Sequence, residues 1–372
     1  MHIHKNKLKW IQLDITARCQ AMCLECTRNI DGKDLNPKIG CANSWDMPLE
    51  IFQKAVTKEM LSNPEQLKKV VLNGNFGDPG IHPQFLDICK YMADNAHEHL
   101  TYRISTNGAM FNPEYWKKVA KILKPMRNHY VVFAIDGLED THHIYRRNTT
   151  YKDVTNNAKA FIDEGGNALW QFIVFNHNRH QVDEARRRAK ELGFANIDFK
   201  GGFGDSGGAR NYTKAINDDT KDIGAKTKKN KAVEVSVTER EAFKKAKDNI
   251  EKVQAKSKAK TKEELLDTAK IACQWYDTKG MYVEYDGTVW MCCWTGDMHK
   301  TLNKTQTEEW AFITDKFGKH FNNLNHHSFD DILNHEFFVD YLDKSFNSTR
   351  DDKNTPRLHT CAKTCIWNKT FV

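Results

Sequence analysis

The stretch Cys19–Cys26, with the sequence CQAMCLEC, places three cysteines in the spacing C-x3-C-x2-C. It follows an apolar run, Trp10–Ile15, that is typical of a buried β-strand. Three thiolates on one short loop can hold three corners of a cubane iron–sulfur cluster and leave the fourth iron without a protein ligand. An open metal position is typical of a site built for chemistry. A zinc knuckle or three buried free cysteines are the alternatives, and no second pair of zinc ligands stands nearby in the sequence.

The bulk composition limits the class of protein. With 372 residues, the chain is long enough for one large domain and a smaller one. It has no apolar run of about 18 residues, and its first residues lack the apolar centre of a signal peptide. We therefore expect no membrane segment and a cytoplasmic location. Ten cysteines in a cytoplasmic chain favour metal binding or catalysis over disulfides.

Strand-like and helix-length segments alternate regularly between residues 8 and 200. The strand-like runs are 9–15, 69–73, 100–105, 130–135, 169–175 and 195–199, and the helical segments lie near 48–62, 83–97, 113–124, 151–164 and 180–192. This alternation predicts an α/β fold with parallel strands and right-handed crossovers, arranged as an open, barrel-like sheet. Reactive groups collect at the C-terminal ends of such strands. The cysteine loop follows the first strand, as this rule requires.

The cysteine loop and the strand before it resemble the radical S-adenosylmethionine (radical SAM) superfamily. The resemblance implies a partial (β/α)6 TIM-like barrel with a 4Fe–4S cluster on Cys19, Cys23 and Cys26. It also implies that the open iron chelates SAM and that an external flavodoxin- or ferredoxin-like donor delivers the electron that releases a 5′-deoxyadenosyl radical. Glu25 stands where the superfamily often has an aromatic residue near the adenine.

Two further strand ends resemble SAM-binding segments of the superfamily. The turn Gly74–Gly80 resembles the glycine-rich segment that supports the SAM amino group, and the resemblance assigns Gly77 and Asp78 to that role, with Asp in place of the usual Glu. The third strand ends in a Ser-Thr-Asn-Gly sequence, in which Ser105 or Asn107 would face the ligand. Ordinary turns have the same composition, so each segment gains its meaning from the cysteine loop.

The fourth and fifth strand ends complete the expected SAM site. Asp136-Gly137, followed by His142 and His143 and then by Arg146, resembles a segment whose arginine reaches the SAM carboxylate or ribose. Asn176, after the fifth strand, stands where relatives often have a polar SAM contact. The paired histidines are compatible with zinc binding, but adjacent histidines on a loop are more often solvated.

The positive charge of the chain is concentrated in one segment. Residues 214–262 contain 14 Lys and 1 Arg against 8 Asp and Glu, which accounts for the net charge of +7 of the whole chain. A solvated, Lys-rich helix with an arm is the simplest interpretation. A docking surface for an acidic partner or for nucleic acid is the alternative. We assign residues 206–265 to a Lys-rich insert or linker between a barrel at 1–205 and a C-terminal domain at 266–372.

A second set of cysteines lies in this C-terminal domain. Cys273 is followed by 13 residues, a glycine, four residues and Cys292, and Cys361 and Cys365 follow a helical insert near 328–345. Residues 282–291 predict a β-hairpin that brings the first two cysteines together. The pattern resembles the twitch domain, a short relative of the SPASM domain. It implies a small α+β domain with one auxiliary 4Fe–4S cluster on these four cysteines, and a zinc ribbon is the alternative.

Three cysteines are left without a place in this scheme. Cys293 is a spare or an alternative to Cys292, and it is the one candidate we name for a thiol that donates a hydrogen atom in catalysis. Cys41 and Cys89 are interpreted as non-ligands.

Relatives with such C-terminal domains modify peptides and proteins, and others dehydrogenate aminocyclitols. We favour a radical SAM oxidoreductase that acts on a peptidyl substrate. A small-molecule dehydrogenase, an RNA-modifying radical enzyme that uses the Lys-rich segment, and a non-catalytic electron carrier remain the alternatives.

Overall fold

The computed structural model describes residues 2–24, 26, 28–30, 33–34, 46–201, 262–300 and 304–365. Glu25, Cys41 and residues 202–261, which include most of the Lys-rich insert at 206–265, lie outside these ranges, so the predictions made for them stay predictions. None of the helices within the described ranges is both long enough and apolar enough to cross a membrane.

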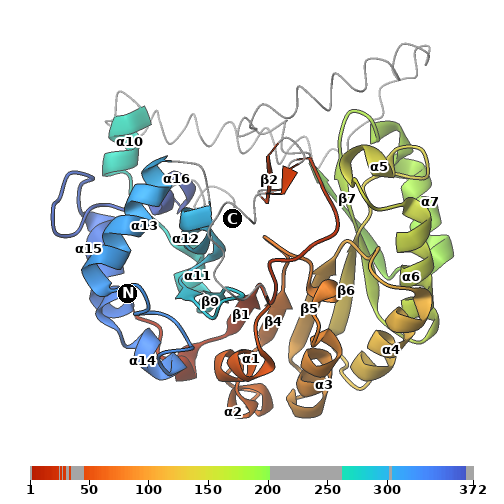
Figure 1. The fold of residues 1–372 in the computed structure, drawn as a ribbon, viewed down its shortest axis with the longest axis horizontal. Helices are drawn as coiled ribbons and strands as arrows, with labels where there is room; N and C mark the ends of the chain where they lie inside the picture. The colour runs from red at the N-terminus through yellow and green to blue at the C-terminus, as the bar shows by residue number, and fades with distance from the viewer. Residues whose placement is uncertain are drawn as a thin grey trace.

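The predicted parallel sheet is present. Its six strands are β1 (Trp10–Leu13), β4 (Lys69–Leu72), β5 (Thr101–Thr106), β6 (His129–Ala134), β7 (Ala168–Val174) and β8 (Asn196–Gly201), each paired in parallel with the next. The strands form an arc that does not close on itself (Figure 1). This open arc confirms the partial (β/α)6 barrel.

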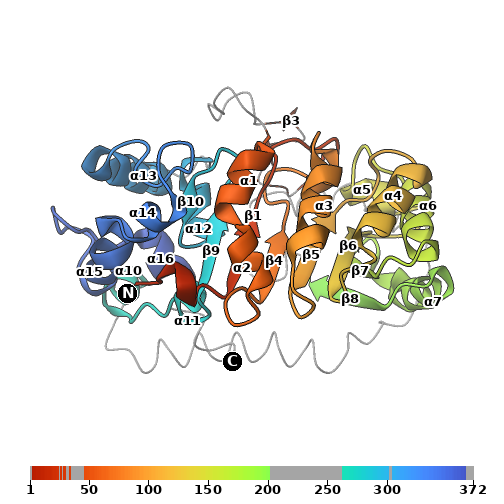
Figure 2. The same cartoon turned by 90° about the horizontal axis from the view of Figure 1, so that it is seen from below.

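Helices cover the convex side of the arc (Figures 1 and 2). They are α1 (Leu49–Ala55), α2 (Lys58–Ser62), α3 (Phe85–Asn95), α4 (Pro113–Leu123), α6 (Tyr151–Asp163) and α7 (Val182–Leu192), whereas the short α5 (His142–Tyr145) follows β6 beside the cysteine loop. The first strand is preceded by η1 (Lys5–Lys7), and short connections contain η3 (Pro79–Ile81) and η4 (Arg179–Gln181). The two-residue strands β2 (Asn29–Ile30) and β3 (Lys33–Asp34) pair with each other in antiparallel orientation. Alternate residues of each strand pack against these helices, and the others face the concave interior, where a ligand has room.

Local sequence signals set the ends of the longer helices. The Asn112 side chain accepts a hydrogen bond from the Tyr115 amide at the start of α4, directly before Pro113. Thr150 caps α6 in the same way. Gly193 ends α7 with a φ of 86°, a left-handed conformation that glycine adopts without steric cost.

The C-terminal part is mostly helical around one hairpin. It contains α10 (Lys262–Thr268), α11 (Gln274–Asp277), β9 (Gly280–Val283), β10 (Val289–Trp290), α12 (Cys293–Gly296), η5 (Asp297–Lys300), α13 (Lys304–Phe317), α14 (Phe329–Leu333), η6 (Phe337–Tyr341), α15 (Leu342–Asn347) and α16 (His359–Cys365). The predicted hairpin and the helices near 328–345 are confirmed. Helix α13 was not predicted from the sequence. Ile313 alone is buried in it, so its apolar stripe is too thin to recognise.

The hairpin extends the barrel sheet. Strand β9 pairs in parallel with β1, so the sheet has eight strands in the order β10-β9-β1-β4-β5-β6-β7-β8. A Cβ atom at Gly280 would lie 2.2 Å from the ring of Trp10, so only glycine allows this close pairing. Trp10 also packs on Trp275, with ring centroids 4.2 Å apart. One hydrophobic core therefore runs from the barrel into the C-terminal part.

Candidate active site

The three cysteines of the Cys19–Cys26 loop lie beyond the C-terminal end of β1. All three line one cavity of about 310 Å³. Cys23 is buried, and Cys19 and Cys26 are half-buried. The Met22 amide donates a hydrogen bond to the Arg147 carbonyl at 3.0 Å, which ties the loop to the segment after β6. The loop therefore presents its thiols together to one space.

Two hydrogen-bond donors lie beside these thiols. Asn107 Nδ2 lies 3.5 Å from Cys19 Sγ, and a guanidinium nitrogen of Arg146 lies 3.6 Å from Cys23 Sγ. Burial raises the pKa of the Cys19 thiol to about 12 and also raises that of Cys23. Thiolates at these positions consequently need positive charge beside them, which iron ligation supplies. The donor set fits an iron–sulfur cluster.

Asp78 is a buried connector at the edge of this cavity. Its Oδ1 accepts hydrogen bonds from Thr106 Oγ1 at 2.8 Å and from the Gly80 amide at 2.9 Å. Its Oδ2 accepts from the Asn107 amide and from Asn107 Nδ2, both at 2.6 Å. Burial raises the pKa of Asp78, and these hydrogen bonds counteract that shift. The carboxylate thus joins the ends of β4 and β5 and orients Asn107.

The glycine-rich turn packs directly against the backbone that leads into the cysteine loop. A Cβ atom at Gly77 would lie 2.1 Å from the Thr16 carbonyl oxygen, and one at Gly74 would lie 2.2 Å from the Gly77 carbonyl oxygen. The Asp78 amide donates to the Arg18 carbonyl at 2.7 Å. The glycines are therefore needed for close approach between two strand ends.

Ser105 and Asn75, which line the cavity, each carry a polar atom without a partner among the described residues. These atoms are Oγ of Ser105 and Nδ2 of Asn75, and both are buried. Buried polar atoms are rarely left unsatisfied, so a ligand with donors and acceptors fits here. The amino acid and ribose groups of SAM have such atoms. Ser105 was predicted from the sequence as a ligand contact. Asn75 was not predicted, although it lies in the glycine-rich turn Gly74–Gly80.

Arg146 reaches the cavity from the segment after β6. Its Nε donates to the buried carboxylate of Asp136 at 2.6 Å, and the Asp136 carboxylate also accepts from the Ile173 amide at 2.5 Å. Arg146 lines the cavity and Arg147 does not. The choice of Arg146 over Arg147 therefore agrees with its position, although its contact with SAM stays a prediction.

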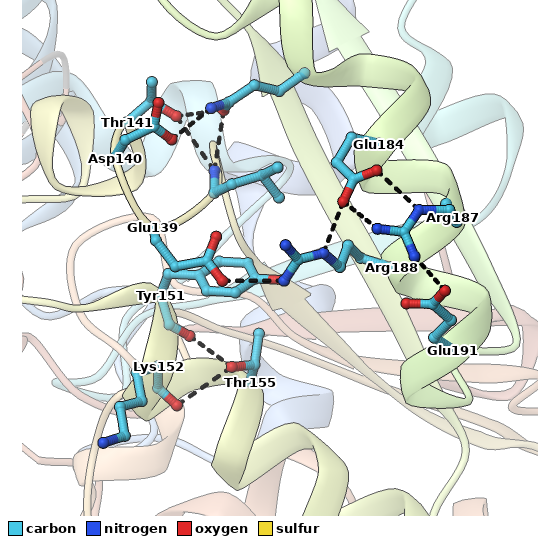
Figure 3. A network of polar contacts seen from close by, with 12 residues as sticks. Glu139, Asp140, Thr141, Tyr151, Lys152, Thr155, Glu184, Arg187, Arg188 and Glu191 are labelled. Atoms are coloured by element: carbon cyan, nitrogen blue, oxygen red, sulfur yellow. Dashed lines mark hydrogen bonds and ion pairs between the residues drawn. The ribbon is translucent and has the colours of Figure 1, made fainter.

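A polar network holds this segment in place. The Thr141 hydroxyl and the Leu138 amide both bind the side-chain oxygen of Gln181, and Gln181 Nε2 donates to Asp140 at 2.6 Å. Arg188 on α7 bridges Glu139 and Glu184 (Figure 3). Helix α7 thereby fixes the chain between Asp136 and Arg146.

Other predicted residues lie elsewhere. Asn176 is exposed and is not among the residues that line the cavity, where Gln171 of β7 is found instead. The interpretation of His142 as solvated is wrong, because α5 turns this side chain inward and its Nε2 lies 2.9 Å from Thr149 Oγ1. His143 is exposed, as expected.

The C-terminal cysteines form a second group. Cys273, Cys292, Cys361 and Cys365 are all buried and all line one small cavity between α11, α12 and α16. Burial raises the pKa of Cys292 to about 12 and raises that of Cys361. Within the described residues, no three Cys, His, Asp or Glu side chains converge closely enough for a single metal ion.

Cys293 is separate from both groups. It is half-buried, it lines neither cavity, and burial together with nearby Cys292 and Asp297 raises its pKa. Its position does not support a role as a hydrogen donor in the first cavity. Cys89 is fully buried in the barrel core, as expected for a non-ligand.

Comparison with known families bears on the second group. Residues 273–366 match the SPASM family, described as an iron–sulfur cluster-binding domain. This segment of the chain is therefore similar to SPASM domains. The twitch/SPASM-like domain predicted from the sequence is confirmed, and the match covers all four cysteines of the second cavity.

Solved structures share the fold of the whole chain. Streptococcus suis SuiB bound to the precursor peptide SuiA is 12% identical, with 96% of this chain and 71% of that chain covered and a TM-score of 0.53. The protein anSMEcpe with bound AdoMet is 14% identical, with 97% and 90% covered and a TM-score of 0.51. These likenesses confirm the predicted radical SAM-type barrel with a SPASM domain at the level of the fold.

One curated protein is similar over a shorter length. The cofactor-modifying protein of the tungsten-containing aldehyde ferredoxin oxidoreductase of Pyrococcus furiosus is 27% identical over 115 residues. This stretch spans 31% of the chain and 28% of that protein.

Proposed function

We propose that the protein is a radical SAM enzyme. Cys19, Cys23 and Cys26 hold a 4Fe–4S cluster that, when reduced, supplies the electron for cleavage of SAM to a 5′-deoxyadenosyl radical, which removes a hydrogen atom from a substrate. The observation that carries this proposal is the single cavity onto which three thiols and the unsatisfied polar atoms of Ser105 and Asn75 converge. The same fold in anSMEcpe has bound AdoMet.

The side chains around the cavity have distinct tasks. Ser105 and Asn75 bind polar groups of SAM, and Asn107, held by Asp78, orients Cys19. Arg146 places a positive charge beside Cys23 and the SAM carboxylate, while Asp136 keeps the guanidinium in position. The apolar group around Ala21, Leu24, Tyr145 and Phe175 shields one side of the cysteine loop from water.

The SPASM domain holds an auxiliary 4Fe–4S cluster through Cys273, Cys292, Cys361 and Cys365. These four residues would supply one ligand to each iron, and a fully ligated cluster would serve electron transfer. A flavodoxin- or ferredoxin-like protein supplies electrons from outside.

A peptide is the substrate that the comparisons favour. SuiB has been crystallised with the precursor peptide SuiA, and anSMEcpe with the Cp18Cys peptide at a TM-score of 0.50. Both share the fold of this chain, so a peptidyl substrate is the first class to screen.

The proposal is tested by anaerobic reconstitution, followed by iron counting and by measurement of 5′-deoxyadenosine with dithionite and SAM. We expect two clusters per chain and deoxyadenosine formation. Cys23→Ala should abolish SAM cleavage, and Cys89→Ala is the matched control, because Cys89 is a buried thiol outside both cavities. Cleavage retained in Cys23→Ala, or absent from the loaded wild type with every peptide screened, would contradict the proposal.

A further inference from the structure

The concave face of the barrel carries a polar row below the first cavity. In the sheet register, Gln12 of β1 lies opposite Val71 of β4, and Val71 lies opposite Arg103 of β5. Successive side chains of a strand point to opposite faces, and the intervening residues Ile11 and Tyr102 pack in the core. Gln12, Val71 and Arg103 therefore share the concave face.

Two donor atoms of this row have no hydrogen-bond partner among the described residues. Gln12 is 8% exposed, and its Nε2 is buried without a hydrogen-bond partner. Nε of Arg103 is also buried and unpartnered. A buried donor without an acceptor costs about 1–3 kcal/mol, so two of them on one face require an explanation.

A second cation adds to the imbalance. Lys69 is half-buried at the start of β4, two residues before Val71 on the same face, and it forms no ion pair among the described residues. Burial and the positive charge of Arg103 lower its pKa. The barrel thus brings two like charges together, and an anion between them would remove the repulsion.

The polar row lies below the first cavity, and its residues are not part of the lining of that cavity. Ser105, which lines that cavity, is two residues beyond Arg103 on β5, or about 7 Å along the strand. The backbones of Gln12 and Arg103 are two strands apart, about 10 Å, and Val71 between them is small. Both long side chains can therefore reach one group held above Val71.

We propose that Arg103, Gln12 and Lys69 form a subsite for an anionic group of the substrate, a carboxylate or a phosphate. The guanidinium offers paired donors that match either group, the Gln12 amide adds a third donor, and Lys69 adds charge. The assignment of this anion to the substrate rests on the proposed function, whereas anion binding itself does not.

The test measures protection of the two cations in the cluster-loaded, full-length protein with SAM. Glutarate, neutral glutaramide or inorganic phosphate is added to separate samples. The rates of phenylglyoxal modification of Arg103 and of acetylation of Lys69 are then measured by peptide mass spectrometry. At a concentration ten times its Kd, a bound anion should slow both reactions about tenfold. Protection by glutarate or by phosphate identifies the source, and glutaramide should have no effect.

Arg127 is the internal control, because it is an exposed arginine that forms a surface ion pair with Glu98. Its modification should be unchanged. Equal slowing at Arg127, or no slowing at Arg103 with either anion, would overturn the proposal.

Two variants separate binding from folding. In Arg103→Gln, the anion should no longer protect Lys69, while the iron content per chain stays at the wild-type value. Arg103→Lys should keep part of the protection of Lys69. Full protection of Lys69 in Arg103→Gln would also overturn the subsite. Deoxyadenosine formation is measured on the same wild-type sample, so that failure of SAM cleavage with intact protection would count against the proposed function alone.

Discussion

The guanidinium of Arg146 connects a buried carboxylate with the cysteine loop, since its Nε lies 2.6 Å from Asp136 Oδ2 and another nitrogen lies 3.6 Å from Cys23 Sγ. Asp136 comes from the end of β6 and Cys23 from the loop after β1, so one side chain spans two strand ends. The side chain of Asp136 is 0% exposed and that of Arg146 is 17% exposed. The pair is thus buried, and each charge depends on the other.

Asp136→Asn should destabilise the protein through this pair. Removing one partner of a buried ion pair leaves the other charge uncompensated, which costs roughly 3 kcal/mol in the free energy of unfolding. Denaturant unfolding of the anaerobic, cluster-loaded protein measures the change. Glu191→Gln is the control, because it removes only an exposed pair with Arg187 on α7 (Figure 3) and should have a much smaller effect. Equal changes in the free energy of unfolding of the two variants would show that the buried pair contributes no more to stability than the exposed pair.

Asp78→Asn should weaken SAM binding through Asn107. Each carboxylate oxygen of Asp78 accepts two hydrogen bonds. An amide NH2 in place of one oxygen would face the donors of Thr106 and Gly80, or those of Asn107. The mismatch costs about 1–3 kcal/mol and displaces the amide that contacts Cys19. Titration calorimetry with SAM on the cluster-loaded variant should give a raised Kd.

Thr106→Ser is the matched control for this prediction, because it keeps the hydroxyl that donates to Asp78. Its SAM affinity should stay close to that of the wild type. An unchanged Kd in Asp78→Asn would mean that the hydrogen bonds around Asp78 serve stability alone.

The stability of the protein should fall as the pH is lowered below 6.5. Burial lowers the pKa of His142 to about 3 and that of His177 to about 4, from an ordinary value of 6.5. The unfolded chain therefore binds these protons first, and each histidine lowers the free energy of unfolding by about 1.4 kcal/mol per pH unit between 6.5 and its folded pKa. Thermal unfolding from pH 7.5 to 5.5 measures this slope.

His142→Gln should make the pH dependence shallower, since glutamine keeps a hydrogen bond to Thr149 and does not titrate. His177 leaves part of the slope in place. The control is His143→Gln, which removes an exposed neighbouring histidine and should keep the wild-type slope. Identical slopes for the two variants would refute the role of His142.

The fold was largely predictable because apolar runs of strand length alternate with helical segments. The buried strands 69–72 and 168–174 are clear examples of such runs. The cysteine groups were predictable because ligand spacing is written directly in the sequence. The orientation of His142 and the exposure of Asn176 were not, because each depends on how a short turn is twisted. The role of Asp78 as a connector was also hidden, since its four donors come from three separate residues.

The adjacent cysteines Cys292 and Cys293 allow a matched test of the SPASM site. Cys292 lines the cavity with Cys273, Cys361 and Cys365, whereas Cys293 lies outside it. Cys292→Ser should therefore lower the iron content by about one cluster, because a cluster held by four thiolates loses a corner. Cys293→Ser changes the neighbouring thiol in the same way and should leave the iron content unchanged. Iron and sulfide counting after anaerobic reconstitution measures both. Loss of iron in Cys293→Ser with full loading of Cys292→Ser would reverse the ligand assignment, and loss in neither would remove the auxiliary cluster from this cavity.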